Sequence, residues 1–447
     1  MSAPVDLWRF VDMLRTRRLF EPGTPIAIAR APGRLDVMGG IADYSGSLVL
    51  ERPIVEATCA AVQRVDRPVV EVTSIGRSPL TLALSSLAPG GEPVAYEVAR
   101  QRFASPDQHW AAYVVGVILV LARERGLPLT SRGMRVVVSS CVPESKGVSS
   151  SAALETSVLQ AAAHAFDLTI EPRDLALLCQ RAENLVAGAP CGVMDQMTCV
   201  FGEPDALMAL LCQPAELQPP VPLPGGLAVW GIDSGERHAI SGSDYGSVRA
   251  GAFMGLRILA DYLRVPGGYL ANLDPPEFER VASQLPEELS GEEFLAGYDG
   301  TSDTVTMVSP GRRYQVRGAT AHPIYERRRA ETFRRLLLES RGDVSGVELG
   351  TLMYESHASY GRCGLGSRGT DRLVELVKSV GPEAGVYGAR ITGGGSGGTV
   401  AVVGRPDASP AIAGIADQYA RETGHRPYVF AGSSPGVAAV GAQVVTV

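Results

Sequence analysis

Lysine is almost absent from this chain of 447 residues, because only Lys146 and Lys378 among its 41 basic residues are lysines. A P-loop nucleotide site needs a lysine after its glycine-rich turn, and a protein kinase needs one on its third strand. Lys146 instead precedes Gly147, and Lys378 lies in the helical pattern VELVKSVG. If the chain binds ATP, it therefore does so without a P-loop lysine and without the lysine of a protein kinase.

The sequence also lacks a CxxC pair, a long apolar run and a signal peptide. Its seven cysteines are odd in number and scattered, which argues against a disulfide framework or a zinc site. The longest apolar stretch, Trp110 to Ala122, is shorter than the roughly 20 residues that cross a bilayer. The start, MSAPVDLWRF, has neither the basic residues nor the apolar run of a signal peptide. We therefore expect a cytoplasmic protein without a membrane partner.

The composition gives no sign of a nucleic-acid partner. The formal net charge is −7, with 45% hydrophobic and 20% charged residues, as in ordinary globular proteins. Negative charge disfavours binding to nucleic acid, although a local basic pocket can still hold a small anion. The chain itself leaves open whether it is a monomer or a homodimer.

The length favours two domains, because a single core stops growing at roughly 250 to 300 residues. Proline and glycine crowd together in AELQPPVPLPGGL, and a new strand pattern, AVWGIDSG, follows them. We therefore place a domain boundary there, with one domain over residues 1–222 and a second over residues 223–447.

Alternating strand and helix patterns predict a mixed α/β fold. Strands are expected in TPIAIARAPG, PVVEVTS and MRVVVSSCVP, and helices in HWAAYVVGVILVLARERG, in PRDLALLCQRAENLV and from near Ser149 onward. The polar, glycine-containing segment from Leu285 to Tyr314 is predicted to be a surface insertion or connection.

The stretch PESKGVSSSAALE is a candidate phosphate site. A strand ends, a glycine turns the chain, and three serines open a helix. The unpaired N–H groups and partial positive charge of a helix N-terminus suit a phosphate, and serine hydroxyls add donors or a magnesium ligand. The simpler interpretation is that Ser149 only caps the helix.

The stretch RITGGGSGGTVAVV contains a GxGxxG match in Gly393, Gly395 and Gly398. A dinucleotide fingerprint opens a helix, whereas these glycines lead into a strand, so we reject a Rossmann site. Two interpretations stay open: a tight hairpin, or a loop whose bare backbone closes on a ligand.

Carboxylates complete the set of candidates. In AENLVAGAPCGVMDQM, Glu183 lies on a predicted helix and Asp195 follows a Gly/Pro-rich corner. A helix-borne glutamate can ligate Mg²⁺ beside phosphates, and a carboxylate after such a turn can act as a general base. Taken singly, Asp195 could be an N-cap, and Asp233 and Tyr245 could be a turn and a core residue.

Four motifs taken together resemble the GHMP small-molecule kinases. They are PGRLDVMGG.ADYSGS, P..KGVSSSAALE, GAPCGVMDQM and ARITGGGSGGTVAVV, in the order and approximate spacing of that family. The third is similar to the PCGIMDQF of the galactokinase branch. GRLDVMGGIADYSGSLVL and WGIDSG.RH also resemble the kinase domain of plant L-arabinokinases. The resemblance implies a two-domain α/β (α+β) fold, with an N-terminal ribosomal-S5-domain-2-like domain and a C-terminal ferredoxin-like domain.

The resemblance also implies roles for particular residues. Asp195 would face the anomeric hydroxyl of a sugar, as a base or an orienting group, with Arg34 beside it. The sugar would contact Arg34, Gly40, Ile41, Asp43, Cys191, Gly192, Asp195 and Tyr245. ATP would contact Trp110, Tyr113, Lys146, Gly147, Val148, Ser149, Ser150, Ser151 and Ala152. Mg²⁺ would be held by Ser150 and Glu183, and the site would be closed by Gly393, Gly394 and Gly395.

The chain departs from the galactokinase pattern at one place. Galactokinases typically have GEHTDY where this chain has GGIADY, so Gly40 and Ile41 stand in place of a glutamate and a histidine. In the family these two residues reach the C6 side of the hexose. L-Arabinose has the galactose configuration without C6, so the departure favours L-arabinose as substrate and L-arabinose 1-phosphate as product. Galactose, or a larger sugar using the space beside Gly40, are the alternatives, and a non-catalytic sugar sensor is an alternative of another class.

Overall fold

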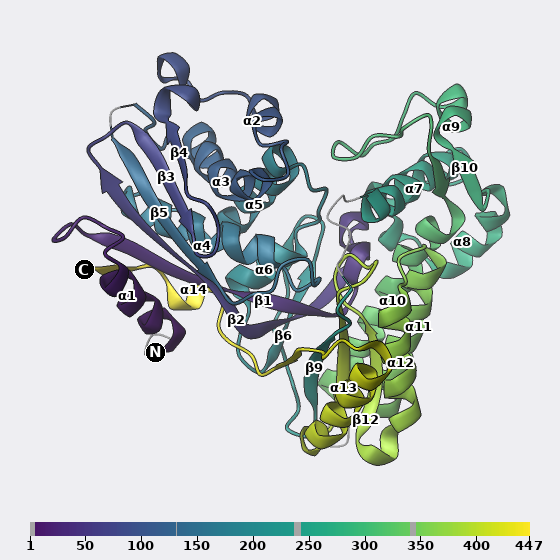
Figure 1. The fold of residues 1–447 in the computed structure, drawn as a ribbon. Helices are drawn as coiled ribbons and strands as arrows, with labels where there is room; N and C mark the ends of the chain where they lie inside the picture. Colours follow the sequence, from purple (N-terminus) through teal and green to yellow (C-terminus); the bar gives the residue numbers. More distant parts are fainter. Residues whose placement is uncertain (1–4, 131, 237–242, 340–345) are drawn as a thin grey trace.

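The computed structural model describes the chain except for residues 1–4, 131, 237–242 and 340–345. One lobe carries the N-terminal half of the chain, and a second carries most of the C-terminal half (Figure 1). Each lobe has its own sheet, so the expected two-domain α/β fold is confirmed. The boundary at residues 222 and 223 stays a prediction.

The sheet of the N-terminal lobe has the order β15-β1-β2-β5-β3-β4, and β6 pairs with β2, β7 and β8. The strands are β1 (Ile26–Met38), β2 (Leu48–Val65), β3 (Val69–Ser74), β4 (Leu80–Ala83), β5 (Gly133–Ser140), β6 (Ala206–Leu211), β7 (Glu216–Leu217), β8 (Val221–Pro222) and β15 (Gln443–Val445).

Both faces of this sheet are covered, which explains why every residue of β1 is buried. Ile26 and Ile28 pack with helix α1 (Val5–Arg17), whereas Ala29 and Ala31 belong to the larger apolar cluster on the other face. The helices on that second face are α3 (His109–Arg125), α4 (Ser150–Ala165), α5 (Pro172–Ala182) and α6 (Met194–Phe201), and the short α2 (Tyr96–Arg102) lies beside α3.

The sequence patterns predicted this part of the fold well. The three expected strands correspond to β1, β3 and β5, and the expected helices to α3, α4 and α5. α3 ends at Arg125, and Gly126 after it has the left-handed conformation that glycine adopts readily. α5 is shorter than expected, because a single π-helical turn, Glu183–Ala187, follows it.

The C-terminal lobe has a four-stranded antiparallel sheet in the order β12-β13-β9-β14. With the helices between its strands, this order gives the split βαβ arrangement of a ferredoxin-like domain. The elements are β9 (Ala228–Asp233), α11 (Gly346–Arg362), α12 (Arg368–Val380), β12 (Val386–Ile391), β13 (Thr399–Gly404), α13 (Ser409–Thr423) and β14 (Val429–Ala431).

A helical subdomain is inserted between β9 and α11, at the upper right of Figure 1. Its elements are α7 (Ser243–Leu259), α8 (Pro275–Val281), β10 (Glu288–Ser290), α9 (Gly291–Gly297), β11 (Arg313–Gln315) and α10 (Arg317–Glu339). The segment expected to be a surface insertion lies here, but it has structure of its own: β10 pairs with β11, and Phe294 and Tyr314 are buried.

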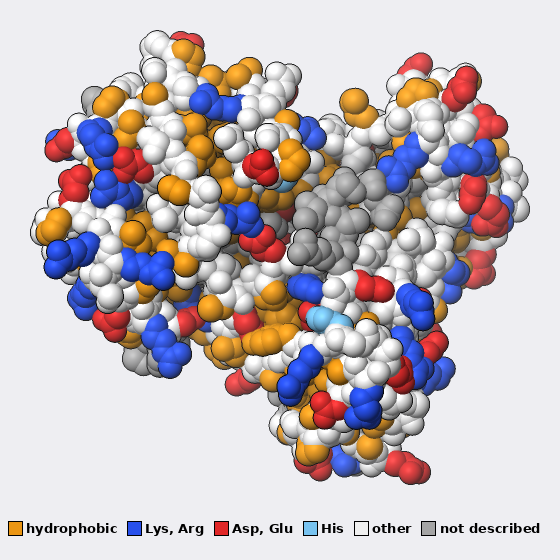
Figure 2. Space-filling model, viewed as in Figure 1, with side chains coloured by type: hydrophobic (Ala, Val, Ile, Leu, Met, Phe, Trp, Pro, Cys, Tyr) orange, Lys and Arg blue, Asp and Glu red, His pale blue; other side chains and the backbone are white. Residues whose placement is uncertain are grey.

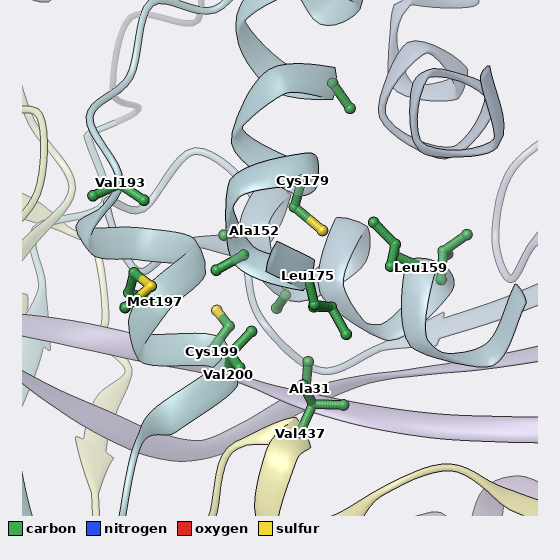
Figure 3. Packing of buried hydrophobic residues seen from close by; sticks show 14 of the residues in the cluster. Ala31, Ala152, Leu159, Leu175, Cys179, Val193, Met197, Cys199, Val200 and Val437 are labelled. Atoms are coloured by element: carbon green, nitrogen blue, oxygen red, sulfur yellow. The ribbon is translucent and has the colours of Figure 1, made fainter. Parts of the chain in front are cut away.

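The C-terminus returns to the N-terminal lobe, which the sequence did not indicate. β15 pairs with β1, and α14 (Val437–Val440) packs against α6 and β1. Val437 joins the apolar cluster that contains Ala31 and Cys199 (Figure 3). The end of the chain therefore supports the helix that carries Asp195. Among the described helices, none has the length and apolar character to span a membrane.

Candidate active site

Asp195 and Arg34 form the centre of the candidate site. Asp195 lies in the first turn of α6, and Arg34 comes from β1. Arg34 donates to Asp195 Oδ1 from Nη2 at 2.7 Å and from Nε at 3.0 Å, and from Nη1 to the carbonyl oxygen of Gly147 at 2.5 Å. Asp195 is not the N-cap of α6, because Val193 occupies that position. The sequence-based N-cap interpretation is therefore wrong.

Two further carboxyls lie behind Arg34. Asp36 and Glu51 are opposite one another on β1 and β2, and Glu51 Oε2 lies 3.1 Å from Arg34 Nε. Burial, and the Asp36 carboxylate beside it, raise the pKa of Glu51 well above its ordinary value. Arg34 thus lies between the Asp195 carboxyl and the buried Glu51 carboxyl.

Ser149 precedes α4 in an unusual conformation. Its φ is +59°, and among the described residues its hydroxyl has no hydrogen-bond partner although it is buried. Ser149 occupies the N-cap position of α4, but its side chain accepts no N–H of the helix, so the interpretation that Ser149 only caps the helix is wrong. The hydroxyl and the N–H groups that open this helix of 16 residues are donors available to an anion.

The glycine-rich segment 393–398 lies directly against residues 146–147, which precede α4. A Cβ on Gly393 would lie 2.8 Å from the carbonyl oxygen of Gly147, and one on Gly398 would lie 2.7 Å from that of Lys146. Both glycines have positive φ. The segment 393–398 joins β12 and β13 as a hairpin, so the two interpretations offered for it are compatible. Its bare backbone lies against residues 146–147.

Lys146 is bound to a carboxylate of the other lobe. Its Nζ lies 3.0 Å from Asp233 Oδ1, which also accepts the N–H of Gly235 in a turn. Asp233 is thus the turn residue that the sequence suggested, and it has an ion-pair partner as well. Arg237 and His238, at the end of the WGIDSG.RH motif, lie outside the described residues.

Trp110 and Tyr113 lie on the first turns of α3, both partly exposed. The Arg77 guanidinium lies 5.5 Å from the centre of the Trp110 ring, and the His109 ring lies edge-on to Tyr113 at 5.8 Å. Burial, together with the Glu183 carboxylate, raises the pKa of Tyr113 well above its ordinary value. The Tyr113 ring is therefore near the Glu183 side of the site.

Glu183 belongs to a buried group of polar side chains. Gln196 donates from Nε2 to Glu183 Oε2 at 2.6 Å and to Glu155 Oε2 at 3.2 Å. Burial and the Asp195 carboxylate raise the pKa of Glu183 to about 7, and a hydrogen bond from Ser151 opposes this. A cation beside Glu183 would offset the cost of burying its charge.

A magnesium ion fits this corner only with ligands from elsewhere. The described residues contain no group of three or more His, Cys, Asp or Glu side chains that could hold a metal. Mg²⁺ is commonly held by one or two protein oxygens together with phosphate oxygens and water. Ser150, the first residue of α4, and Glu183 fit that pattern.

Asp43 and Gly192 approach each other closely on the sugar side. A Cβ on Gly192 would lie 1.8 Å from Asp43 Oδ2, so only glycine fits there. Tyr245 Oη lies 3.5 Å from Asp43 Oδ1. Burial, and then the Asp195 carboxylate, raise the pKa of Asp43 to about 7, while the Arg249 guanidinium lowers it.

Arg249 is a residue that the sequence reasoning missed. It forms a buried two-pronged ion pair with Asp303, at 2.8 and 2.7 Å, and donates from Nη1 to the carbonyl oxygen of Cys191 at 3.1 Å. Asp303 comes from the inserted segment. The available signal was the position of Arg249 one helical turn after Tyr245, on the same face of α7.

Gly40 and Ile41 are in a different environment from the one expected. Both are fully buried, and a Cβ on Gly40 would lie 1.9 Å from Tyr360 Oη. Ile41 packs in the apolar cluster that contains Tyr44 and Phe253. The alternative of a longer sugar needs space beside Gly40, and Tyr360 fills that space.

The structure thus brings most of the expected residues together. Arg34, Gly147, Asp195 and Gly393 are in contact, Ser149 to Ser151 and Glu183 border them, and Asp43, Gly192 and Tyr245 form the opposite side. The surface is hollowed between the N-terminal lobe and the helical subdomain (Figure 2).

Comparison with known proteins gives consistent findings. The GHMP kinases N terminal domain matches residues 112–203, and the GHMP kinases C terminal domain matches residues 330–421. The chain is 45% identical to the L-arabinokinase of Arabidopsis thaliana over 95% of its own length, but it spans only 47% of that protein. It is 31% identical to the galactokinase of Chloroflexus aggregans over 90% of each chain.

Among solved structures, the galactokinase of Lactococcus lactis in complex with galactose has the same fold. Its TM-score is 0.78 at 20% sequence identity, and the match covers 98% of this chain and 100% of the galactokinase. The fold of the chain is thus that of a known group of proteins.

Proposed function

The chain belongs to the GHMP kinase family, and from this premise we propose that it is an ATP-dependent sugar 1-kinase that converts L-arabinose to L-arabinose 1-phosphate. The observation that carries the reaction type is the Arg34–Asp195 pair, 2.7 Å apart, beside the backbone of Gly147. A carboxylate that can take a hydroxyl proton is thereby placed next to a segment that can receive phosphate. A cytoplasmic location stays a prediction from the sequence.

In this proposal Asp195 faces the anomeric hydroxyl and accepts its proton as the oxygen attacks the γ-phosphorus of ATP. Arg34 fixes the carboxylate by two hydrogen bonds to one oxygen, so the second oxygen, Oδ2, is left for the sugar. Phosphoryl transfer depends mainly on positioning and on stabilising charge. The residues of this chain meet both needs without a P-loop lysine.

The ATP phosphates would bind at the start of α4, where the glycine-rich segment 393–398 lies against residues 146–147. The N–H groups that open α4 and the unpaired Ser149 hydroxyl are donors there. Lys146 would act through its ion pair with Asp233, which ties the segment to β9. Trp110 and Tyr113 would line the adenine end. Mg²⁺, when bound by Ser150 and Glu183, supplies positive charge to the phosphate oxygens.

The choice of L-arabinose rests on what lies near Asp43. Asp43 and Tyr245 would hold ring hydroxyls, with Cys191 and Gly192 beside them. Gly40 and Ile41 offer no polar side chain, so the C6 hydroxyl of galactose would have no partner from these two positions. The 45% identity to an L-arabinokinase supports the same sugar.

The alternatives have less support. A heptose or octose would need room beside Gly40, and Tyr360, Asp36 and Arg390 occupy it. A sugar sensor would not need Asp195 and Arg34 held together as an ion pair. Galactose remains the competing substrate, since galactokinases are among the relatives of the chain.

A substrate panel tests the proposal. Purified protein with Mg-ATP would be given L-arabinose, D-galactose, D-glucose and a heptose, and ADP release would be recorded. We expect the highest kcat/KM for L-arabinose. If galactose or a heptose gave the higher value, the proposed substrate would be wrong while the reaction type would stand. If no sugar released ADP, the kinase proposal itself would fail.

A further inference from the structure

Tyr360 lies between two parts of the candidate site and contacts the backbone of both. It is near the end of α11 and fully buried. Its hydroxyl accepts the N–H of Ile41 at 2.9 Å and donates to the carbonyl oxygen of Gly393 at 3.0 Å. Ile41 belongs to the turn of residues 40–45, which carries Asp43, and Gly393 opens the glycine-rich segment 393–398. One hydroxyl thus joins the sugar side to the phosphate side.

Gly40 lies so close to the Tyr360 hydroxyl that it leaves no room for a side chain at position 40. Its φ is +48°, and any Cβ would come within 1.9 Å of Tyr360 Oη. A side chain at position 40 and the Tyr360 hydroxyl therefore exclude each other. Removing the hydroxyl would relieve the shortest of these contacts, so positions 40 and 360 form a matched pair.

The Tyr360 ring is held rigidly by its neighbours. Arg390 lies 5.0 Å from the ring centre, and the His322 ring lies edge-on at 5.2 Å. Arg390 in turn forms a fully buried ion pair with Asp36 at 2.8 Å, and Asp36 accepts the N–H of Gly40 at 3.1 Å. A displacement of the turn would therefore be passed to the ring and, through the hydroxyl, to Gly393.

From these contacts we infer that Tyr360 is a positioning residue that couples sugar binding to nucleotide binding. The inference rests on the proposed sugar kinase function. Sugar bound against Asp43 holds the turn, the Tyr360 hydroxyl then holds Gly393, and Gly393 lies against Gly147 where the phosphates are received. By linkage, nucleotide bound at the segment tightens the sugar to the same degree.

The direct test compares the wild type with Tyr360→Phe. The Kd of the sugar would be measured calorimetrically with and without a non-hydrolysable ATP analogue and Mg²⁺. We expect the analogue to tighten sugar binding at least about fivefold in the wild type. The binding ratio is the Kd of the sugar without the analogue divided by its Kd with the analogue. In Tyr360→Phe this binding ratio should fall close to one. The Kd of the sugar without the analogue should change by a smaller factor than the binding ratio.

A matched control is Tyr314→Phe. Tyr314 is also buried, and its hydroxyl accepts the backbone N–H of Ser309 at 2.8 Å within the helical subdomain. This variant loses the same hydroxyl without touching the turn or the glycine-rich segment, so its ratio should equal that of the wild type. An unchanged ratio in Tyr360→Phe, or a wild-type ratio of one, would overturn the inference.

A second measurement needs no activity and no ligand. Gly40→Ala would be made alone and together with Tyr360→Phe, and the melting temperatures compared. We expect Gly40→Ala to lower the Tm less in the Phe background than in the wild type, since the shortest clash is gone. Equal decreases would show that the two positions are not matched.

The outcomes separate this inference from the proposed function. If the wild type phosphorylates another sugar, L-arabinose is the wrong substrate, and the binding ratio is measured with the sugar that is used. If L-arabinose is phosphorylated and the binding ratio is the same in Tyr360→Phe as in the wild type, the role of Tyr360 is refuted and the proposed function stands.

Discussion

Sugar binding should become weaker at acidic pH because of Asp43. Burial, and then the neighbouring Asp195 carboxylate, raise the pKa of this carboxyl from its ordinary value near 3.8 to about 7. Ring hydroxyls of a sugar donate hydrogen bonds, so they favour the ionised carboxylate over the protonated form, which offers less acceptor capacity. Sugar binding in the proposed site therefore requires a proton to leave Asp43.

The size of the effect follows from the titration. With a pKa of about 7, Asp43 is roughly one-tenth ionised at pH 6 and roughly nine-tenths ionised at pH 8. The KM for the sugar should therefore rise about eight- to tenfold between pH 8 and pH 6. The stability of the ligand-free protein should change in the opposite direction and decrease as the pH rises. The raised pKa of Asp43 in the folded state contributes stability that is fully present below the ordinary pKa and is lost as the pH rises through about 7.

The assay is the KM for L-arabinose at saturating Mg-ATP from pH 6 to pH 8, together with the Tm of the ligand-free protein. Asp43→Asn is the control, because it removes the titrating group while keeping a side chain of the same shape. Its KM should be high and nearly independent of pH. Glu183 also has a pKa raised to about 7, so a pH dependence that persists in Asp43→Asn would belong to Glu183 and would refute the reasoning about Asp43.

Three other changes test the site. Asp195→Asn should lower kcat by about 10²- to 10⁴-fold while the Kd of ATP, measured by calorimetry, stays within about twofold, since the lost group acts on the proton of the sugar. Arg249→Lys should raise the KM for the sugar about tenfold and leave the KM for ATP unchanged, because lysine loses the paired contact with Asp303 and the bond to the Cys191 carbonyl; equal rises in both constants would contradict this. Gly40→Glu should lower the free energy of unfolding by at least about 2 kcal/mol in a denaturant titration, and a stable variant would contradict the packing at Tyr360.

Much of the fold could be predicted from local patterns. The apolar run between His109 and Gly126 has helical periodicity and a glycine stop, and α3 covers those residues. The serines after Gly147 predicted the start of α4. Such features depend on neighbours a few residues apart, which is why periodicity and capping residues reveal them.

The site depends on contacts between distant residues, which local patterns do not encode. Arg34 and Asp195 are 161 positions apart, and their pairing was expected only because the motifs resemble a family. Ile41 and Tyr360 are 319 positions apart, and no motif connected them. The sequence therefore identified Gly40 as a departure from the family, but it did not reveal the Tyr360 hydroxyl that fills the space beside Gly40.

Other differences come from the surroundings of a single side chain. Ser149 is of a residue type that commonly caps helices, but it has a positive φ and its side chain makes no capping hydrogen bond. Asp303 lies in a polar, glycine-containing segment, which is typical of a surface loop, and the buried charge of Arg249 brings it inside. At Asp303, a tertiary contact thus overrides the local preference.

The most direct test of the proposed function is a competition in one reaction. Equal concentrations of L-arabinose and D-galactose would be incubated with the protein and Mg-ATP, and the two sugar 1-phosphates quantified by nuclear magnetic resonance before either sugar is depleted. The ratio of products equals the ratio of the kcat/KM values. L-Arabinose 1-phosphate should predominate, and an excess of galactose 1-phosphate would contradict the account.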